Sequence, residues 1–403
     1  MKRSMIAALV AASLLAACGG GDSGTNGVTA VKVVGASLAD TGTFGFKFTV
    51  QASAMGESYR VYPEWVAQAY NLPTLCSAYV ATGPSTFAVQ PGCTNHAVAG
   101  AGINFGRLSD TNEDEVSDTF TALPSVPASQ LYQLQALGAQ GFSFGDLLIV
   151  GEGSANDTAT LVTAFLTDLQ TAGTLNTTLF SQVVNSLLDN GEAVLAQGPV
   201  VAGTAYMEGL AKALVDSVRT NAIQNGARRV LILNTLDITR TPRFEATLAQ
   251  IASAPGGSPE QANAVRNLVR AWINAYNTAL VNETRQLQGR VEVFDFYAVF
   301  NTQLADPAAY GLTNLTQTVC DETYAQADDY TPTLATAGAT SLNAGPVRAS
   351  CTDTNASSIT PSAGTGTTWW TTYLFADNFH PTPRGHELLG NQVNQRLRQL
   401  GWL

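Results

Sequence analysis

The strongest constraint on the fold is a set of four short apolar runs, each of which stops abruptly at small or polar residues. Apolar runs of this length are typical of strands that are buried on both faces of a parallel sheet. Stretches with helical periodicity lie between the runs. This alternation predicts βαβ crossovers and a parallel sheet covered by helices on both faces. The predicted strands span residues 31–34, 145–151, 229–234 and 291–296, and the predicted helices span 158–171, 177–196, 205–225 and 259–289.

The first apolar run leads into a turn that carries a serine. Val31 to Val34 is followed directly by Gly35-Ala36-Ser37-Leu38-Ala39-Asp40. Ligands of open α/β sheets bind just outside the carboxyl ends of the strands, so Ser37 is a candidate nucleophile. The alternative is a turn serine with no chemical role, because serine is common where strands end.

A serine nucleophile needs a base near neutral pH, and imidazole is the usual one. The chain contains three histidines, and His380 follows Asp377 by three residues. A carboxylate at that spacing can accept the Nδ1–H of the imidazole, which fixes the tautomer and stabilises the imidazolium. We therefore expect His380 as the base and Asp377 as its orienting partner. We expect His96 and His386 to be structural residues.

The same chemistry needs hydrogen-bond donors for the developing oxyanion. Three candidates lie in turns at predicted strand ends: the backbone N–H groups of Ser37 and Gly100, and the side-chain amide of Asn156. One such donor stabilises the transition state by about 3 kcal/mol. Glycine lets the main chain approach a substrate closely, and the asparagine NH₂ does not titrate.

Taken in order, these segments resemble motif blocks of the GDSL or SGNH hydrolase family. The resemblance extends from about residue 31 to the C-terminus. It points to the branch of the family that includes secreted lipases, lecithinases and haemolysins. Gly35–Gly42 is similar to GDSLSDTG, Asn95–Ala101 to NYAVGGA, Ser154–Asp157 to GxND, and Asp377–Thr382 to DxxHPT, with further likeness over 228–234 and 307–314.

The resemblance implies a three-layer α/β/α sandwich with a mostly parallel, flavodoxin-like sheet. It also implies hydrolysis of acyl-ester or lipid substrates without a metal or another cofactor. In that chemistry Ser37 is the nucleophile, His380 the base and Asp377 its partner, while Ser37, Gly100 and Asn156 supply the oxyanion donors.

Two positions depart from the motif blocks. Ala36 replaces the aspartate that usually precedes the serine, so the turn lacks a carboxylate that could brace it. Ser154 replaces a glycine, which we expect to put a side chain beside the oxyanion site. Neither change removes an atom that the chemistry requires.

The N-terminus has the pattern of an export signal. Lys2 and Arg3 precede an apolar stretch too short to span a bilayer, and small residues lead to Cys18. The pattern resembles a bacterial lipobox, which implies a signal peptide at 1–17, lipid on Cys18 and a flexible tether at 18–29. Gly19 then suggests the outer membrane. The alternative is an ordinary secretory signal and a secreted protein.

Four further cysteines suggest two disulfides, because the count is even in an exported chain. Of the three connectivities we expect the local one, Cys76–Cys93 and Cys320–Cys351. The first pair would hold an irregular loop at 71–94. The second would pin the base of a long surface insertion at 321–368 within one hydrolase domain at 30–403. The cysteines do not have zinc-site spacing.

The formal charge of -11 argues against a nucleic-acid partner, which needs a basic face. The acidic segment 110–118 resembles a calcium loop but lacks its central glycine and closing glutamate, so we expect a solvated loop. Trp369 and Trp370 suit either the wall of an acyl pocket or a buried aromatic pair.

These observations favour a monomeric serine esterase or lipase with a lipid anchor. Two alternatives stay open. An acyltransferase would use the same three residues but pass the acyl group to an alcohol. A non-catalytic surface lipoprotein would bind lipid or glycan in the same cleft, and the altered motif blocks motivate it.

Overall fold

The computed structural model describes residues 27–83, 86–111, 116–171, 178–324 and 351–403. The predicted signal peptide, Cys18 and the tether up to residue 26 lie outside these residues. So do residues 112–115 of the acidic segment and residues 325–350 of the predicted insertion.

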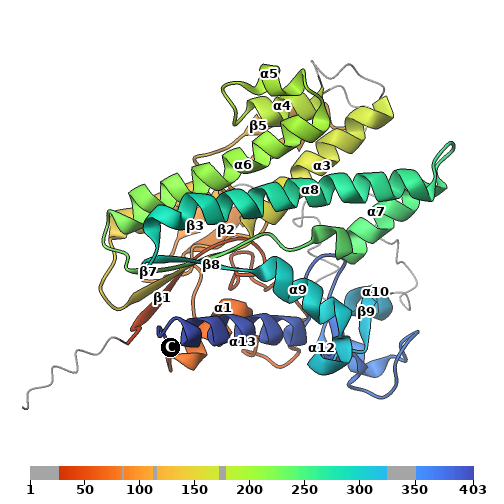
Figure 1. The fold of residues 1–403 in the computed structure, drawn as a ribbon. Helices are drawn as coiled ribbons and strands as arrows, with labels where there is room; N and C mark the ends of the chain where they lie inside the picture. Colours follow the sequence, from red (N-terminus) through yellow and green to blue (C-terminus); the bar gives the residue numbers. More distant parts are fainter. Residues whose placement is uncertain (1–26, 84–85, 112–115, 172–177, 325–350) are drawn as a thin grey trace, which may run out of the picture.

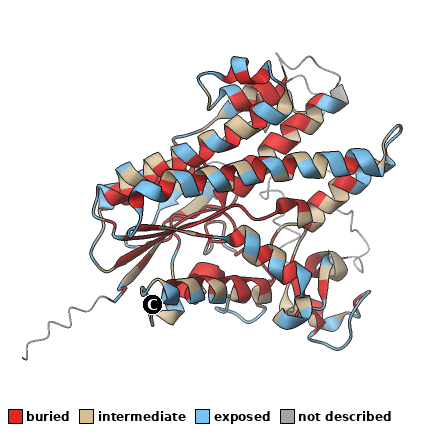
Figure 2. Ribbon diagram, in the orientation of Figure 1, coloured by how far each residue is buried: buried red, intermediate tan, exposed pale blue. Residues whose placement is uncertain are grey.

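A four-stranded parallel sheet forms the centre of the molecule (Figure 1), as the apolar runs predicted. All residues of β6 and β7 are buried, which is why each strand, after its first residue, is continuously apolar rather than alternating (Figure 2). The strand order is β1-β6-β7-β8. The strands span β1 (Ala30–Val34), β6 (Asp146–Val150), β7 (Arg229–Leu233) and β8 (Val291–Phe294).

An extended segment at 94–98 continues the sheet beyond β1. The N–H of Val33 donates to Thr94 O at 3.0 Å, and the N–H of His96 donates to Val33 O at 2.8 Å. The N–H of Val98 then donates to Gly35 O at 3.2 Å. This pairing is parallel. It therefore brings the turn after residue 98 to the same edge of the sheet as the turn that holds Ser37.

Helices cover both faces of the sheet, which confirms the predicted three-layer architecture (Figure 1). One layer contains α3 (Gly153–Thr171), α6 (Pro199–Ser217) and α8 (Pro259–Thr284), and the other contains α1 (Tyr62–Ala69) and α13 (Pro383–Gln399). The structure also contains the α-helices α2 (Gln130–Gln140), α4 (Leu179–Asn185), α5 (Gly191–Leu195), α7 (Pro242–Ser253), α9 (Phe296–Ala305), α10 (Val319–Tyr324) and α12 (Asp353–Ser358).

Helix α8 shows how local sequence and packing agree. The hydroxyl of Ser258 accepts the N–H of Gln261 at 3.3 Å, and Pro259 occupies the first turn, where its missing N–H costs nothing. Trp272 and the other apolar residues of one stripe are buried against α6. Gly203 on α6 makes this close approach possible, since a Cβ there would lie 2.2 Å from the Trp272 ring.

Three predicted elements differ from the structure. Residues 71–94 contain a hairpin, β2 (Tyr79–Gly83) and β3 (Thr86–Val89), rather than only an irregular loop. The stretch 177–196 forms two short helices, α4 and α5, because the chain turns between them before Gly191. The helix predicted at 205–225 begins earlier, at Pro199, and continues as a π-helical turn, Val218–Ile223.

Both predicted disulfides are present, Cys76–Cys93 and Cys320–Cys351. In the described part of the insertion, residues 362–368 are exposed, but Cys351 and Ala356 are fully buried. They form a second apolar cluster with Trp369 and other residues. The cluster comprises Val50, Val319, Cys320, Cys351, Ala356, Trp369, Trp370, Tyr373 and Ala376.

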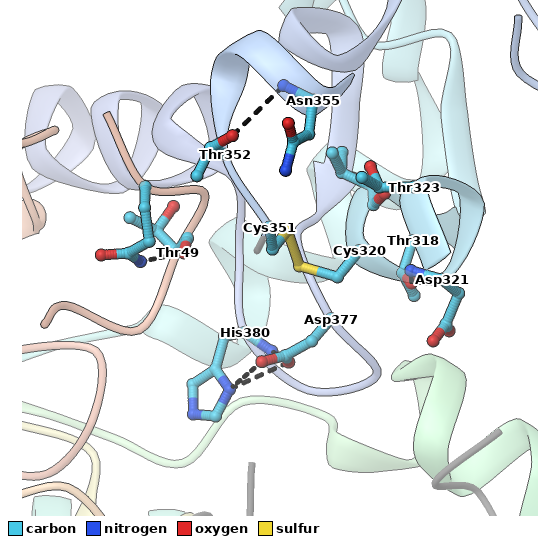
Figure 3. The surroundings of a disulfide bond; sticks show 12 residues. Thr49, Thr318, Cys320, Asp321, Thr323, Cys351, Thr352, Asn355, Asp377 and His380 are labelled. Carbon is cyan, nitrogen blue, oxygen red and sulfur yellow. Dashed lines mark hydrogen bonds and ion pairs between the residues drawn. A yellow bond between two sulfur atoms is a disulfide. The ribbon is translucent and has the colours of Figure 1, made fainter. Parts of the chain in front are cut away.

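Figure 3 shows this second disulfide beside the loop that carries Asp377 and His380. The N–H of Cys320 donates to Ala376 O at 2.8 Å, immediately before Asp377. Trp369 and Trp370 donate their indole N–H groups to Ala356 O and Ser357 Oγ. The tryptophans are therefore buried, and they belong to the same apolar cluster as Ala376, the residue before Asp377.

Replacing Cys320 and Cys351 together by alanine should lower the free energy of unfolding by about 2–4 kcal/mol, since the bond closes a long loop in the unfolded chain. Urea denaturation of the two proteins measures this loss. The matched control is the Cys76→Ala, Cys93→Ala double variant, whose bond spans 17 residues rather than 31, so its loss should be slightly smaller. An unchanged urea midpoint would contradict the prediction.

Candidate active site

The structure brings Ser37 together with His380 and Asp377, two neighbouring residues that lie far from it in the sequence. His380 Nε2 lies 2.8 Å from Ser37 Oγ, and His380 Nδ1 lies 2.9 Å from each carboxylate oxygen of Asp377. A carboxylate only accepts, so Nδ1 carries the proton and Nε2 is left to accept the hydroxyl proton of Ser37. Ser37 and His380 are 4% and 5% exposed.

A tight loop between β10 (Tyr373–Phe375) and α13 holds the imidazole in place. Asp377 Oδ1 accepts the backbone N–H groups of Phe379 and His380 at 2.9 and 2.7 Å. The N–H of Ala376 donates to His380 O, and the hydroxyl of Thr382 donates to Tyr373 O. The Thr382 hydroxyl also accepts the N–H of Gly385 at 3.2 Å and so caps α13.

The turn that carries Ser37, residues 35–40, is held from the neighbouring elements. Glu152, in the connection between β6 and α3, accepts the N–H groups of Ala36 at 3.1 Å and Leu38 at 2.9 Å through one oxygen, Oε1. Gln133 on α2 accepts the N–H of Gly35 at 2.9 Å. Sequence analysis missed both partners.

Glu152 supplies a carboxyl group where Ala36 has none. It is only 3% exposed, and burial raises its pKa to about 7, although hydrogen bonds from backbone N–H groups, its own and those of Ala36 and Leu38 among them, oppose the shift. The available signal was a glutamate directly after a buried strand, a costly position for an unpartnered charge. Sequence spacing could not show that the groups bound by Glu152 are the N–H groups of Ala36 and Leu38, in the turn after β1.

A second buried carboxylate connects the 35–40 turn to the turn at 98–101. Asp40 accepts the N–H groups of Gly42 and Thr43 through Oδ1 and that of Ala99 at 2.9 Å through Oδ2. Burial raises the pKa of Asp40 above its ordinary value. Asp40 thus anchors the residue directly before Gly100.

Gly100 lies in the 98–101 turn with φ +80°, a conformation that favours glycine. The turn is closed by the N–H of Ala101 donating to Val98 O at 3.0 Å. On its far side, Asn156 Nδ2 donates to Ala101 O at 2.8 Å. The turn is therefore fixed between Asp40 and the first turn of α3.

Three donors are left for a ligand. Among the described residues, the backbone N–H groups of Ser37 and Gly100 have no hydrogen-bond acceptor. The amide of Asn156 has a second hydrogen beyond the one bound to Ala101. Ser37 and Asn156 line one small cavity of about 10 Å³, the room of one water molecule. Gly100 does not line that cavity.

The rest of the cavity lining is apolar, apart from Glu152. It is formed by Leu38, Ala155, Leu236 and Phe379. The tryptophan pair does not contribute, and Ser154 does not line the cavity, contrary to expectation. The hydroxyl of Ser154 instead accepts a hydrogen bond from Thr235.

The two other histidines have structural surroundings, as expected. His96 Nδ1 lies 3.2 Å from the Tyr79 hydroxyl, and burial lowers the His96 pKa to about 4. His386, at the start of α13, is fully buried with Nε2 3.4 Å from Phe48 O, and burial lowers its pKa to about 3. Both imidazoles are therefore neutral near pH 7.

The described part of the chain contains no cluster of three or more His, Cys, Asp or Glu residues arranged to hold a metal ion. Within the same residues, none of the helices has both the length and the apolar character that crossing a membrane requires.

Comparison with known proteins assigns a family. A family model described as GDSL-like lipase/acylhydrolase matches residues 5–393. A search of curated proteins finds no match to the chain.

The raised pKa of Glu152 predicts a pH-dependent difference between the wild type and Glu152→Gln. A raised carboxyl pKa stabilises the fold below its unfolded value of 4.5, and this contribution is lost as the pH rises through about 7. Glutamine keeps the Oε1 acceptor and does not titrate. The variant should therefore gain on the order of 2 kcal/mol relative to wild type between about pH 5 and about pH 8.

Urea denaturation of both proteins at the two pH values measures this difference. The other titrating groups, Asp40, Asp157, His96 and His386 among them, are present in both proteins and cancel. Parallel stability curves for the two proteins would contradict the prediction.

Proposed function

We propose that this chain, which belongs to the GDSL-like lipase/acylhydrolase family and is an acyl hydrolase, cleaves carboxylic esters through an acyl-enzyme on Ser37. The observation that carries the proposal is the 2.8 Å distance between Ser37 Oγ and His380 Nε2, with Asp377 on the opposite ring nitrogen. A serine hydroxyl that is hydrogen-bonded to an oriented imidazole is an activated nucleophile.

In the first half of the reaction, Ser37 Oγ attacks the ester carbonyl carbon and His380 Nε2 takes the hydroxyl proton. Asp377 keeps the Nδ1–H in place and stabilises the imidazolium. The tetrahedral oxyanion accepts hydrogen bonds from the N–H groups of Ser37 and Gly100 and from the Asn156 amide. His380 then returns the proton to the leaving alcohol, and the acyl group stays on Ser37.

In the second half, water takes the place of the alcohol. His380 removes a proton from the water, whose oxygen attacks the acyl carbon. The bond between the acyl carbon and Ser37 Oγ then breaks, His380 returns the proton to Oγ, and the carboxylic acid leaves. The apolar side chains of Leu38, Leu236 and Phe379 suit the hydrocarbon part of an acyl group. The substrate class that we propose is therefore an acyl ester, lipids included.

We also propose that the mature protein is anchored at the outer membrane by lipid on Cys18. The support is the export signal at residues 1–17 and the residues around its cleavage site. The predicted tether at 18–29 ends earlier than expected, because Val28 is buried in the main core and the N–H of Thr29 donates to Gly145 O at 2.7 Å.

Ser37→Ala should reduce hydrolysis of short p-nitrophenyl esters by at least about 10³-fold, because the nucleophile is lost while the fold is kept. Initial rates with acetyl and butyryl esters measure the loss, and thermal melting should be nearly unchanged. A fluorophosphonate probe should label the wild type on Ser37 and leave the variant unlabelled.

Equal turnover in the wild type and Ser37→Ala would contradict the assignment. A well-folded wild type that is inert to both the esters and the probe would instead favour a lipid-binding or glycan-binding protein.

Asn156→Ala should lower kcat by about 10²-fold with little change in KM, since an oxyanion donor acts mainly in the transition state. Steady-state kinetics on the butyryl ester measures the two constants. Asn104→Ala is the matched control, because this nearby amide donates to Ser186 and Tyr206 and not to a turn at the cavity. Equal effects of the two substitutions would contradict the role of Asn156.

A further inference from the structure

The peptide groups on either side of Ser37 share one hydrogen-bond acceptor. We propose that Glu152 is a positioning residue that holds Ser37 for attack by accepting the N–H groups of Ala36 and Leu38. The inference rests on the proposed function of Ser37 and adds a residue that the motif blocks do not contain. In this chain, a side chain from the connection between β6 and α3 takes over the bracing that a carboxylate at position 36 could have supplied.

The hydrogen bonds fix the turn from both sides of the nucleophile. Glu152 Oε1 lies 3.1 Å from the nitrogen of Ala36 and 2.9 Å from that of Leu38. Gln133 adds a clamp at Gly35, accepting its N–H at 2.9 Å and donating to its carbonyl at 3.2 Å. Because the N–H groups of Gly35, Ala36 and Leu38 are occupied, the N–H of Ser37 is the one among residues 35–38 that remains for an oxyanion.

Glu152 also connects the nucleophile to a second part of the site. It directly precedes α3, whose first turn carries Asn156. One short stretch of chain therefore holds the Ser37 turn with the Glu152 side chain and donates from the Asn156 amide. A shift of this stretch would move the nucleophile and an oxyanion donor together, and displacements of about 1 Å can cost about 10²-fold in rate.

The brace works as a hydrogen-bond acceptor rather than as a charge. Both N–H groups bind Oε1, and Oε2 is buried with no hydrogen-bond partner among the described residues. Burial raises the Glu152 pKa to about 7, so a neutral carboxyl is readily populated. A neutral group beside Ser37 adds no negative charge next to the oxyanion. Glutamine, which keeps the acceptor, should replace it in this role.

Glu152→Leu and Glu152→Gln test the proposal. Leucine has a similar size but leaves the two N–H groups without an acceptor, so kcat should fall about 10²-fold with KM changed less than about threefold. The rate of fluorophosphonate labelling should fall by a similar factor. Glutamine should restore kcat to within about threefold of wild type. All rates are expressed per folded protein, with the folded fraction taken from circular dichroism.

Asp168, on the helix that Glu152 precedes, offers a matched control. Its carboxylate is also buried and accepts two backbone N–H groups, those of Leu179 and Phe180 at 3.0 and 2.9 Å. It lies about 24 Å further along α3, at about 1.5 Å per residue. Asp168→Leu should destabilise the protein as Glu152→Leu does, while kcat per folded molecule stays at the wild-type value.

If Glu152→Leu does not fold, Glu152→Asp keeps a carboxyl group but withdraws it by about 1.5 Å, one C–C bond. This variant should lose at least about tenfold in labelling rate. The inference is overturned if folded Glu152→Leu or Glu152→Asp labels and turns over as wild type does. It is also overturned if glutamine fails to restore activity. Failure of the proposed function would give a different result from failure of this inference, because the wild type itself would then neither react with the probe nor hydrolyse esters.

Discussion

The site depends on one hydrogen bond, between the imidazole of His380 and the hydroxyl of Ser37, which joins the two ends of the chain. A parallel sheet makes this contact possible, because all its strands end at one edge. The turn after β1 carries Ser37 at that edge, the 94–98 segment adds Gly100, and α3 after β6 adds Asn156. The loop between β10 and α13 places the imidazole of His380 against Ser37 at this edge.

Sequence reasoning found the strands and the three residues Ser37, Asp377 and His380 because both leave local patterns. Buried strands are continuous apolar runs, and Asp377 and His380 lie three residues apart. It did not reach Glu152, because a side chain that binds the backbone of another strand has no characteristic spacing. The hairpin at 79–89 was missed for a related reason, since its strands are short, and most of their residues are at least partly exposed, without an apolar run.

Buried carboxyl groups hold the turns of this edge. Asp40, Glu152 and Asp157 each accept backbone N–H groups of a turn at the edge, and burial raises the pKa of all three. Acceptors of this kind satisfy main-chain groups that would otherwise be buried without partners. The arrangement fixes the turns tightly, but it leaves groups near the nucleophile whose ionisation the fold must oppose.

The bond between Cys320 and Cys351 has a consequence for when the enzyme matures. It fixes Cys320, whose backbone N–H donates to the carbonyl oxygen of Ala376, the residue before Asp377. That tie closes only after an oxidant has acted on the thiols, which a reducing cytosol does not favour. A newly made chain therefore reaches the final rigidity of the loop that carries Asp377 and His380 only where its thiols can be oxidised, so the support behind the imidazole depends on the redox state of its surroundings.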